Sequence, residues 1–144
     1  MPPLLNGFWL LLPPLAWNLA FTARLKLERA FDLGTAPAWV TGGEHLTRIL
    51  CFAGALWVPM DADRRGLALY GVGLVVYFAS WWPVMGPQAA GLPTRSPLWF
   101  GPAVTPLLWL AGIAWAGRAP WFLALSVIFL GFHVGGYRAA FRGA

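Results

Sequence analysis

Three ionisable side chains lie close together at the start of a long hydrophobic stretch. The segment 41–60, TGGEHLTRILCFAGALWVPM, contains Glu44, His45 and Arg48, and it predicts a membrane helix that begins near Thr41. Thr41 and Glu44 have the spacing of a capping box, in which each side chain bonds to the other residue's backbone N–H. Glu44 and Arg48 are four residues apart with the acid first, the favourable order for a helical ion pair, and His45 lies on an adjoining face.

A carboxylate, an imidazole and a guanidinium at this place could carry out acid–base chemistry or bind an anion. A charge at the bilayer centre costs roughly 2.5 to 3.5 kcal/mol on insertion scales, so these groups must be paired, lie near the interface or face protein. A histidine can change its charge near neutral pH. Arg48 can bind a phosphate or carboxylate unless Glu44 already occupies it. The simplest alternative is that Glu44 and Arg48 only neutralise each other, with His45 at the interface.

The composition is that of a membrane protein. Of the 144 residues 59% are hydrophobic and 10% are charged, whereas a soluble domain carries about a quarter of its residues as charges. The net charge of +5 lies in short segments between apolar runs, so we expect no nucleic-acid partner. Cys51 is the single cysteine, which excludes an intrachain disulfide and a cysteine metal site within one chain, and we expect no metal site.

Five hydrophobic runs are long enough to cross a bilayer. They predict an all-α integral membrane protein, one transmembrane domain over residues 1–144, with five spans at about 4–21, 41–60, 67–85, 97–117 and 120–137. Prolines inside the first and fourth spans predict two kinked helices. Residues 22–40 predict an amphipathic cytoplasmic loop, with a solvated charged loop as the alternative.

The basic residues give the orientation. One side of the predicted bundle has six, Arg24, Lys26, Arg29, Arg95, Arg138 and Arg142, and the other has three, Arg64, Arg65 and Arg118. The positive-inside rule therefore places the N-terminus outside and the C-terminus in the cytoplasm. We expect a multi-pass protein of the inner (cytoplasmic) membrane of a bacterium.

The polar residues of the five spans converge at one depth. In the predicted topology Glu44, His45 and Arg48 share the cytoplasmic half with Asn18, Tyr77, Ser80, Thr105, His133 and Tyr137. This predicts a cytoplasm-facing intramembrane pocket that binds a membrane lipid or another amphiphilic small molecule and could modify it chemically. In a reaction Glu44, His45 and His133 would be the acid–base groups. Arg48, Asn18, Tyr77, Ser80, Thr105 and Tyr137 would bind the ligand.

The fifth span has two faces. Gly131 and Gly135 form a GxxxG pair that allows close approach of another helix, so we expect a possible homo-oligomer through this face. His133 points roughly the opposite way, because two residues turn a helix by about 200°. If that side faces the bundle interior, His133 can meet Glu44.

Several alternatives stay open. His45 and His133 could supply both axial ligands of a haem, and together with Glu44 they could hold zinc in an open site. The intramembrane ionisable groups also suit a small proton-coupled transporter, although the outer half of the spans lacks them. A non-catalytic accessory subunit is a further alternative. The sequence identifies neither a cofactor nor a substrate, and it leaves open whether the chain is an enzyme.

Overall fold

The computed structural model describes residues 5–21, 36–61, 63–85 and 96–143, with the side chains of the last four of these residues excepted. The described part of the chain is helical and contains no strand, and Asn6 and Pro59 form an isolated bridge. The helices are α1 (Phe8–Phe21), α2 (Ala38–Ala55), α3 (Arg64–Met85), the short 3-10 helix η3 (Pro97–Phe100), α4 (Gly101–Val104), α5 (Pro106–Ala116) and α6 (Pro120–Gly143).

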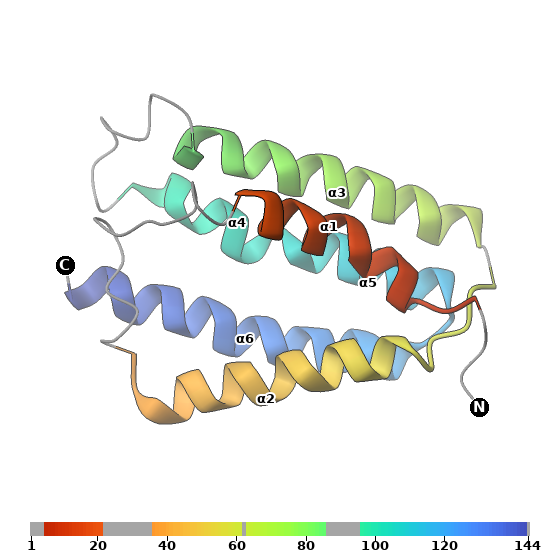
Figure 1. Ribbon diagram of the computed structural model, residues 1–144, viewed down its shortest axis with the longest axis horizontal. Helices are drawn as coiled ribbons and strands as arrows, with labels where there is room; N and C mark the ends of the chain where they lie inside the picture. The colour runs from red at the N-terminus through yellow and green to blue at the C-terminus, as the bar shows by residue number, and fades with distance from the viewer. Residues whose placement is uncertain (1–4, 22–35, 62, 86–95, 144) are drawn as a thin grey trace.

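The helical segments run alternately in opposite directions along the long axis of the molecule (Figure 1). Five helix ends lie on the side of the molecule that carries the C-terminus. They are the last residues of α1, α3 and α6 and the first residues of α2 and η3. The pairs α2–α6 and α3–α5 form two layers, and α1 lies in front of α5. We call the end with the C-terminus the C-terminal end of the bundle.

Among the described residues, three helical segments are long and apolar enough to cross a membrane. They are Arg64–Met85 in α3, Pro97–Ala116 across η3, α4 and α5, and Pro120–Ala139 in α6. α1 is apolar but has only 14 residues, a length of about 21 Å at 1.5 Å per residue. The predicted all-α fold is therefore confirmed for the described residues, and these three segments could cross a membrane by their length and composition.

The capping box predicted at Thr41 is wrong. α2 begins three residues earlier, because the carbonyl of Pro37 accepts hydrogen bonds from the N–H groups of Val40 and Thr41, at 2.9 and 3.2 Å. Pro37 itself is extended, with φ −55° and ψ 140°, and has no side-chain cap. Thr41 thus lies inside the helix, and the carboxylate of Glu44 is free to contact other side chains.

Other predicted boundaries shift as well. α3 begins at Arg64, since Asp63 Oδ1 accepts hydrogen bonds from the N–H groups of Arg65 and Gly66 at 2.9 and 3.3 Å. α6 continues past Tyr137 to Gly143. The predicted amphipathic loop lies mostly outside the described residues, and its last three residues belong to α2.

Glycines set the close packing of α3 against α5. A Cβ atom added at Gly66, Gly73 or Gly112 would overlap the backbone of the partner helix. Small residues let helix backbones approach in this way, which maximises van der Waals contact where no hydrophobic effect operates between helices. Around this pair the core contains large apolar side chains that are almost fully buried, including Leu110 and Phe122.

The double proline of α1 is accommodated by a neighbouring helix. Pro14 has no N–H, so the carbonyl of Leu10 loses its usual helical donor. The hydroxyl of Tyr70 in α3 donates to that carbonyl at 2.7 Å. In the fourth hydrophobic segment, the helix is divided at Thr105, the residue before Pro106, and the Thr105 hydroxyl donates to the Gly101 carbonyl at 2.9 Å.

Candidate functional site

Glu44 is held from two helices. Its Oε1 accepts a hydrogen bond from Arg48 Nη2, one turn further along α2, and lies 2.9 Å from His133 Nδ1 of α6. The side chains of Glu44 and His133 are 17% and 19% exposed, whereas that of Arg48 is 41% exposed. A carboxylate accepts but does not donate, so Nδ1 carries the proton of this bond and Nε2 of His133 is directed elsewhere.

Small residues bring the two helices close enough for this contact. Gly43 packs on the ring of Phe132, which a Cβ atom would overlap. At Gly136 a Cβ atom would come within 3.4 Å of Glu44 Oε2, so α6 offers a bare stretch of backbone beneath the carboxylate. Glycines on both helices therefore let Glu44 reach α6.

Aromatic rings surround the ionic group. His133 stacks on Phe129 with ring centroids 5.6 Å apart and meets Tyr137 edge-on at 5.0 Å. The guanidinium of Arg48 lies over the Phe129 ring, with Cζ 5.9 Å from the centroid, a cation–π distance. These contacts fix the imidazole and the guanidinium next to Glu44, and we call Glu44, Arg48, His133 and Tyr137 the ionic cluster.

His45 does not join the ionic cluster. Its side chain is exposed, and Nδ1 lies 2.7 Å from the Thr41 carbonyl on its own helix. The zinc site that the sequence allowed from Glu44, His45 and His133 is not formed, because no three His, Cys, Asp or Glu side chains of the described residues are grouped to hold a metal ion. The two imidazoles that a haem would need are likewise held by different partners.

A second polar group connects α1, α3 and the break between α4 and α5. The hydroxyl of Tyr77 donates to Asn18 Oδ1 at 2.7 Å, and Ser80 Oγ lies 3.2 Å from Thr105 Oγ1. Ser80 also donates to the Tyr77 carbonyl at 2.6 Å, which joins the two pairs. We call these four residues the hydroxyl chain.

Tyr137 lies between the two polar groups. It contacts His133 in the ionic cluster and interacts electrostatically with both Glu44 and Tyr77. The structure thus brings eight of the nine predicted site residues into two neighbouring groups near the C-terminal end of the bundle, and it leaves His45 on the outer face of α2.

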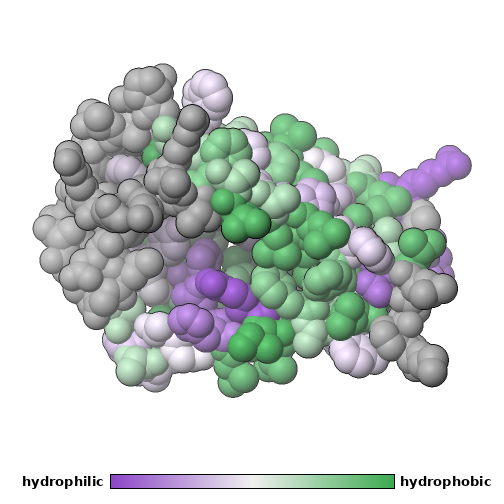
Figure 2. All heavy atoms as spheres, in the orientation of Figure 1, coloured by the Kyte–Doolittle hydropathy of each residue, from purple (hydrophilic) through white to green (hydrophobic). Residues whose placement is uncertain are grey.

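The surface around this region is mostly apolar. Figure 2 shows hydrophobic residues over most of the described part of this face and a group of hydrophilic side chains beside a hollow, toward the C-terminal end. The side chain of Arg48 is 41% exposed, whereas those of Glu44 and His133 are 17% and 19% exposed. An external ligand would therefore meet the guanidinium before the carboxylate.

Sequence reasoning missed two contributors to this arrangement. Tyr70 donates to the Leu10 carbonyl of α1, and a proline four residues after a carbonyl is the sequence signal for such a donor. Phe129 supports both Arg48 and His133, and its spacing four residues before His133 on α6 was the available signal.

The predicted GxxxG face of α6 is largely open. A Cβ atom at Gly131 would meet no heavy atom within 4 Å, and one at Gly135 would make an ordinary contact with Val40 of α2 at 3.6 Å. The close approach of helix backbones in α3 and α5 uses other glycines, Gly66, Gly73 and Gly112.

Comparison with known proteins gives no relative: no family model matches the chain, and neither the curated proteins nor the solved structures searched contain a match.

Proposed function

We propose that the chain crosses the cytoplasmic membrane of a bacterium five times, with its N-terminus outside. The proline-distorted spans are the first, α1, and the fourth, which consists of η3, α4 and α5. The alternating directions of the helical segments support this topology, since each connection then lies on one side of the membrane (Figure 1). The C-terminal end, which carries Arg138, is the cytoplasmic end under the positive-inside rule. The short α1 fits if the bilayer thins locally around it.

Within this topology, the function is the binding of an amphiphilic small molecule with an anionic head group at the ionic cluster. The observation that carries the proposal is the state of Arg48. One of its nitrogens contacts Glu44, and its remaining N–H groups have no partner among the described residues. A guanidinium has five N–H donors in a planar fork, so the free donors suit a phosphate or carboxylate.

His133 supports this assignment from the other side. Glu44 Oε1 contacts both Arg48 and His133. Because the carboxylate has these two partners, it does not fully neutralise the charge of Arg48. The apolar tail of the ligand would lie against the exposed hydrophobic surface nearby, and Ile49 of α2, 64% exposed, is part of that surface.

The same geometry can transfer a proton. Glu44 orients His133 through Nδ1, so in the neutral tautomer that carries its proton on Nδ1 the acceptor is Nε2. Such a nitrogen is a general base if the ligand presents an acidic proton within about 3 Å. His45 has no part in this step, because its ring is bonded to its own helix.

Native mass spectrometry of the protein in mild detergent, with lipid extraction of the same sample, tests the proposal. We expect an anionic amphiphile to co-purify with the unmodified chain and to be lost from Arg48→Gln. Arg64→Gln is the matched control, because Arg64 is an exposed arginine at the start of α3, at the opposite end of the bundle. A ligand retained equally by both variants, or no ligand at all on the unmodified protein, would contradict binding at Arg48.

A further inference from the structure

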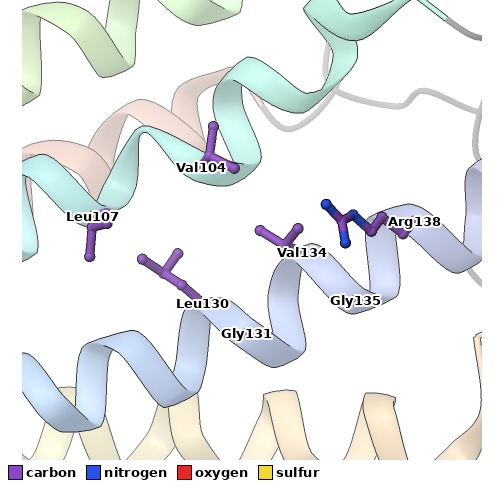
Figure 3. A pocket seen from close by; sticks show the side chains of 7 residues that line it. All are labelled: Val104, Leu107, Leu130, Gly131, Val134, Gly135 and Arg138. Carbon is purple, nitrogen blue, oxygen red and sulfur yellow. The ribbon is translucent and has the colours of Figure 1, made fainter.

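A groove separates α6 from α4 and α5 on the side of α6 away from the ionic cluster. Its volume is about 370 Å³, and its lining includes Val104, Leu107, Leu130 and Val134. Figure 3 shows Leu107 from one side and Leu130 and Val134 from the other pointing into the space between the helices. Ligand sites in proteins usually fall between about 300 and 1,000 Å³, so the groove is large enough for part of a small amphiphile.

The groove lies on the lateral surface of the bundle. Val104 and Leu107 are 48% and 41% exposed, and Gly131 has no heavy atom within 4 Å of the place where its Cβ would be. In a bilayer an apolar recess at such a place is in contact with hydrocarbon chains. Its walls belong to two segments that are long and apolar enough to cross a membrane, Pro97–Ala116 and Pro120–Ala139.

One charge lies at the end of the groove. The side chain of Arg138 turns toward the same space as Val134 (Figure 3), and no acidic side chain of the described residues pairs with it. Arg138 comes directly after the apolar part of α6, at the level where lipid phosphates are found if this end is cytoplasmic. The groove thus combines an apolar trough with a cation at its polar end.

We propose that this groove binds one chain of an acidic membrane phospholipid, whose phosphate is held by Arg138. The complementarity of charge favours a lipid over a second copy of the protein, because α6 would present the same unpaired cation to its own copy. Shape favours it as well. An extended hydrocarbon chain fits a trough between two helices better than another helix, whose diameter with side chains is about 10 to 12 Å.

This site is separate from the ionic cluster. The groove is lined by α6 residues at 130, 131, 134, 135 and 138, whereas the ionic cluster and its aromatic support use 129, 133 and 137. The proposal therefore holds or fails independently of ligand binding at Arg48. It requires only that α4, α5 and α6 lie in the bilayer with Arg138 at a surface.

Photo-labelling tests the proposal. The full chain is reconstituted into vesicles of equal parts phosphatidylcholine and phosphatidylglycerol, with a trace of one or the other lipid bearing a photoreactive group on its acyl chain. We expect labels on peptides that contain residues 104–107 and 130–138, with more label from phosphatidylglycerol. Arg138→Gln should reduce that preference by about fivefold, the factor that one arginine near an acidic surface supplies.

Two glycine variants distinguish a loss of labelling caused by filling the groove from one caused by any added side chain on a helix surface. Gly131→Leu should lower labelling by both lipids, because the new side chain enters the groove without overlapping any atom at Cβ. Gly71→Leu is the matched control on α3, where a Cβ atom also meets nothing within 4 Å, and it should leave groove labelling unchanged. Equal labelling by the two lipids in the unmodified protein would overturn the recognition of an acidic head group. A dimer that Gly131→Leu dissociates, with no label in the groove, would show a second copy there instead.

Discussion

The contact between Glu44 and His133 predicts a measurable coupling between α2 and α6. The perturbation is a double-mutant cycle of Glu44→Ala and His133→Ala, which isolates the pairwise free energy from the other losses that each substitution causes. His45 provides the control, since it is the chain neighbour of Glu44 but bonds to the Thr41 carbonyl instead.

The expected coupling is about 1 to 1.5 kcal/mol. A hydrogen bond to a charged group contributes about 1.5 to 3 kcal/mol in soluble proteins. In membrane bundles, interhelical hydrogen bonds average only about 0.6 and reach about 1.7 kcal/mol, because the unfolded chain in the membrane also finds partners. The bond between Glu44 Oε1 and His133 Nδ1 is 2.9 Å long and both side chains are less than one-fifth exposed, so we expect the upper part of that range.

The assay is reversible unfolding in mixed detergent micelles, followed by far-ultraviolet circular dichroism. The Glu44→Ala and His133→Ala cycle should give the coupling above, and the Glu44→Ala and His45→Ala cycle should give less than about 0.3 kcal/mol, the level at which independent sites add. If the two couplings are equal, the structural distinction between the two histidines is wrong.

Three further predictions concern the free energy of unfolding in the same assay. Tyr70→Phe should lower it by about 1 to 2 kcal/mol, because a carbonyl of α1 loses its donor; in a Pro14→Ala background, where the helix supplies an N–H again, the loss should be much smaller. Gly73→Ala should lower it by about 1 to 3 kcal/mol through overlap with α5, whereas Gly71→Ala, which meets no neighbour, should raise it by up to about 1 kcal/mol; equal effects would refute the close α3–α5 packing. Arg118→Gly should raise the free energy of unfolding by about 1 kcal/mol, because Arg118 has φ 49° and a glycine adopts that conformation without strain. A lower free energy of unfolding would mean that the exposed contact of Arg118 with Asp61 outweighs the strain.

Hydropathy alone was sufficient to predict the helical class of this chain. Its apolar runs are long, and a helix satisfies every backbone group internally, which is what a bilayer requires. Helix boundaries were less predictable. Thr41 and Glu44 match the capping-box pattern, but α2 begins at Ala38, three residues before Thr41. The sequence contains no signal that ranks these two starts.

The contacts within the candidate site were partly predictable. The pairing of Glu44 with Arg48 follows from helical spacing alone, and the structure contains it. The contact between Glu44 and His133 depends on α6 lying beside α2, which periodicity does not encode. The prediction that His45 belongs to the site failed for a related reason. Two adjacent residues of a helix point about 100° apart, and only the packing decides whether Glu44 or His45 faces the neighbouring helix.

An intramembrane site requires that α2 crosses the membrane, since α2 carries Glu44 and Arg48. Cysteine labelling with a membrane-impermeant maleimide measures this directly. In a Cys51→Ala background, which removes the single native thiol, we introduce Trp39→Cys or Trp57→Cys near the two ends of α2, where both tryptophans are exposed, at 71% and 58%. If α2 crosses the membrane, we expect Trp57→Cys to be labelled from outside intact spheroplasts and Trp39→Cys to be labelled only in inside-out vesicles. Labelling of both from the same side would contradict a transmembrane α2 and, with it, an intramembrane site.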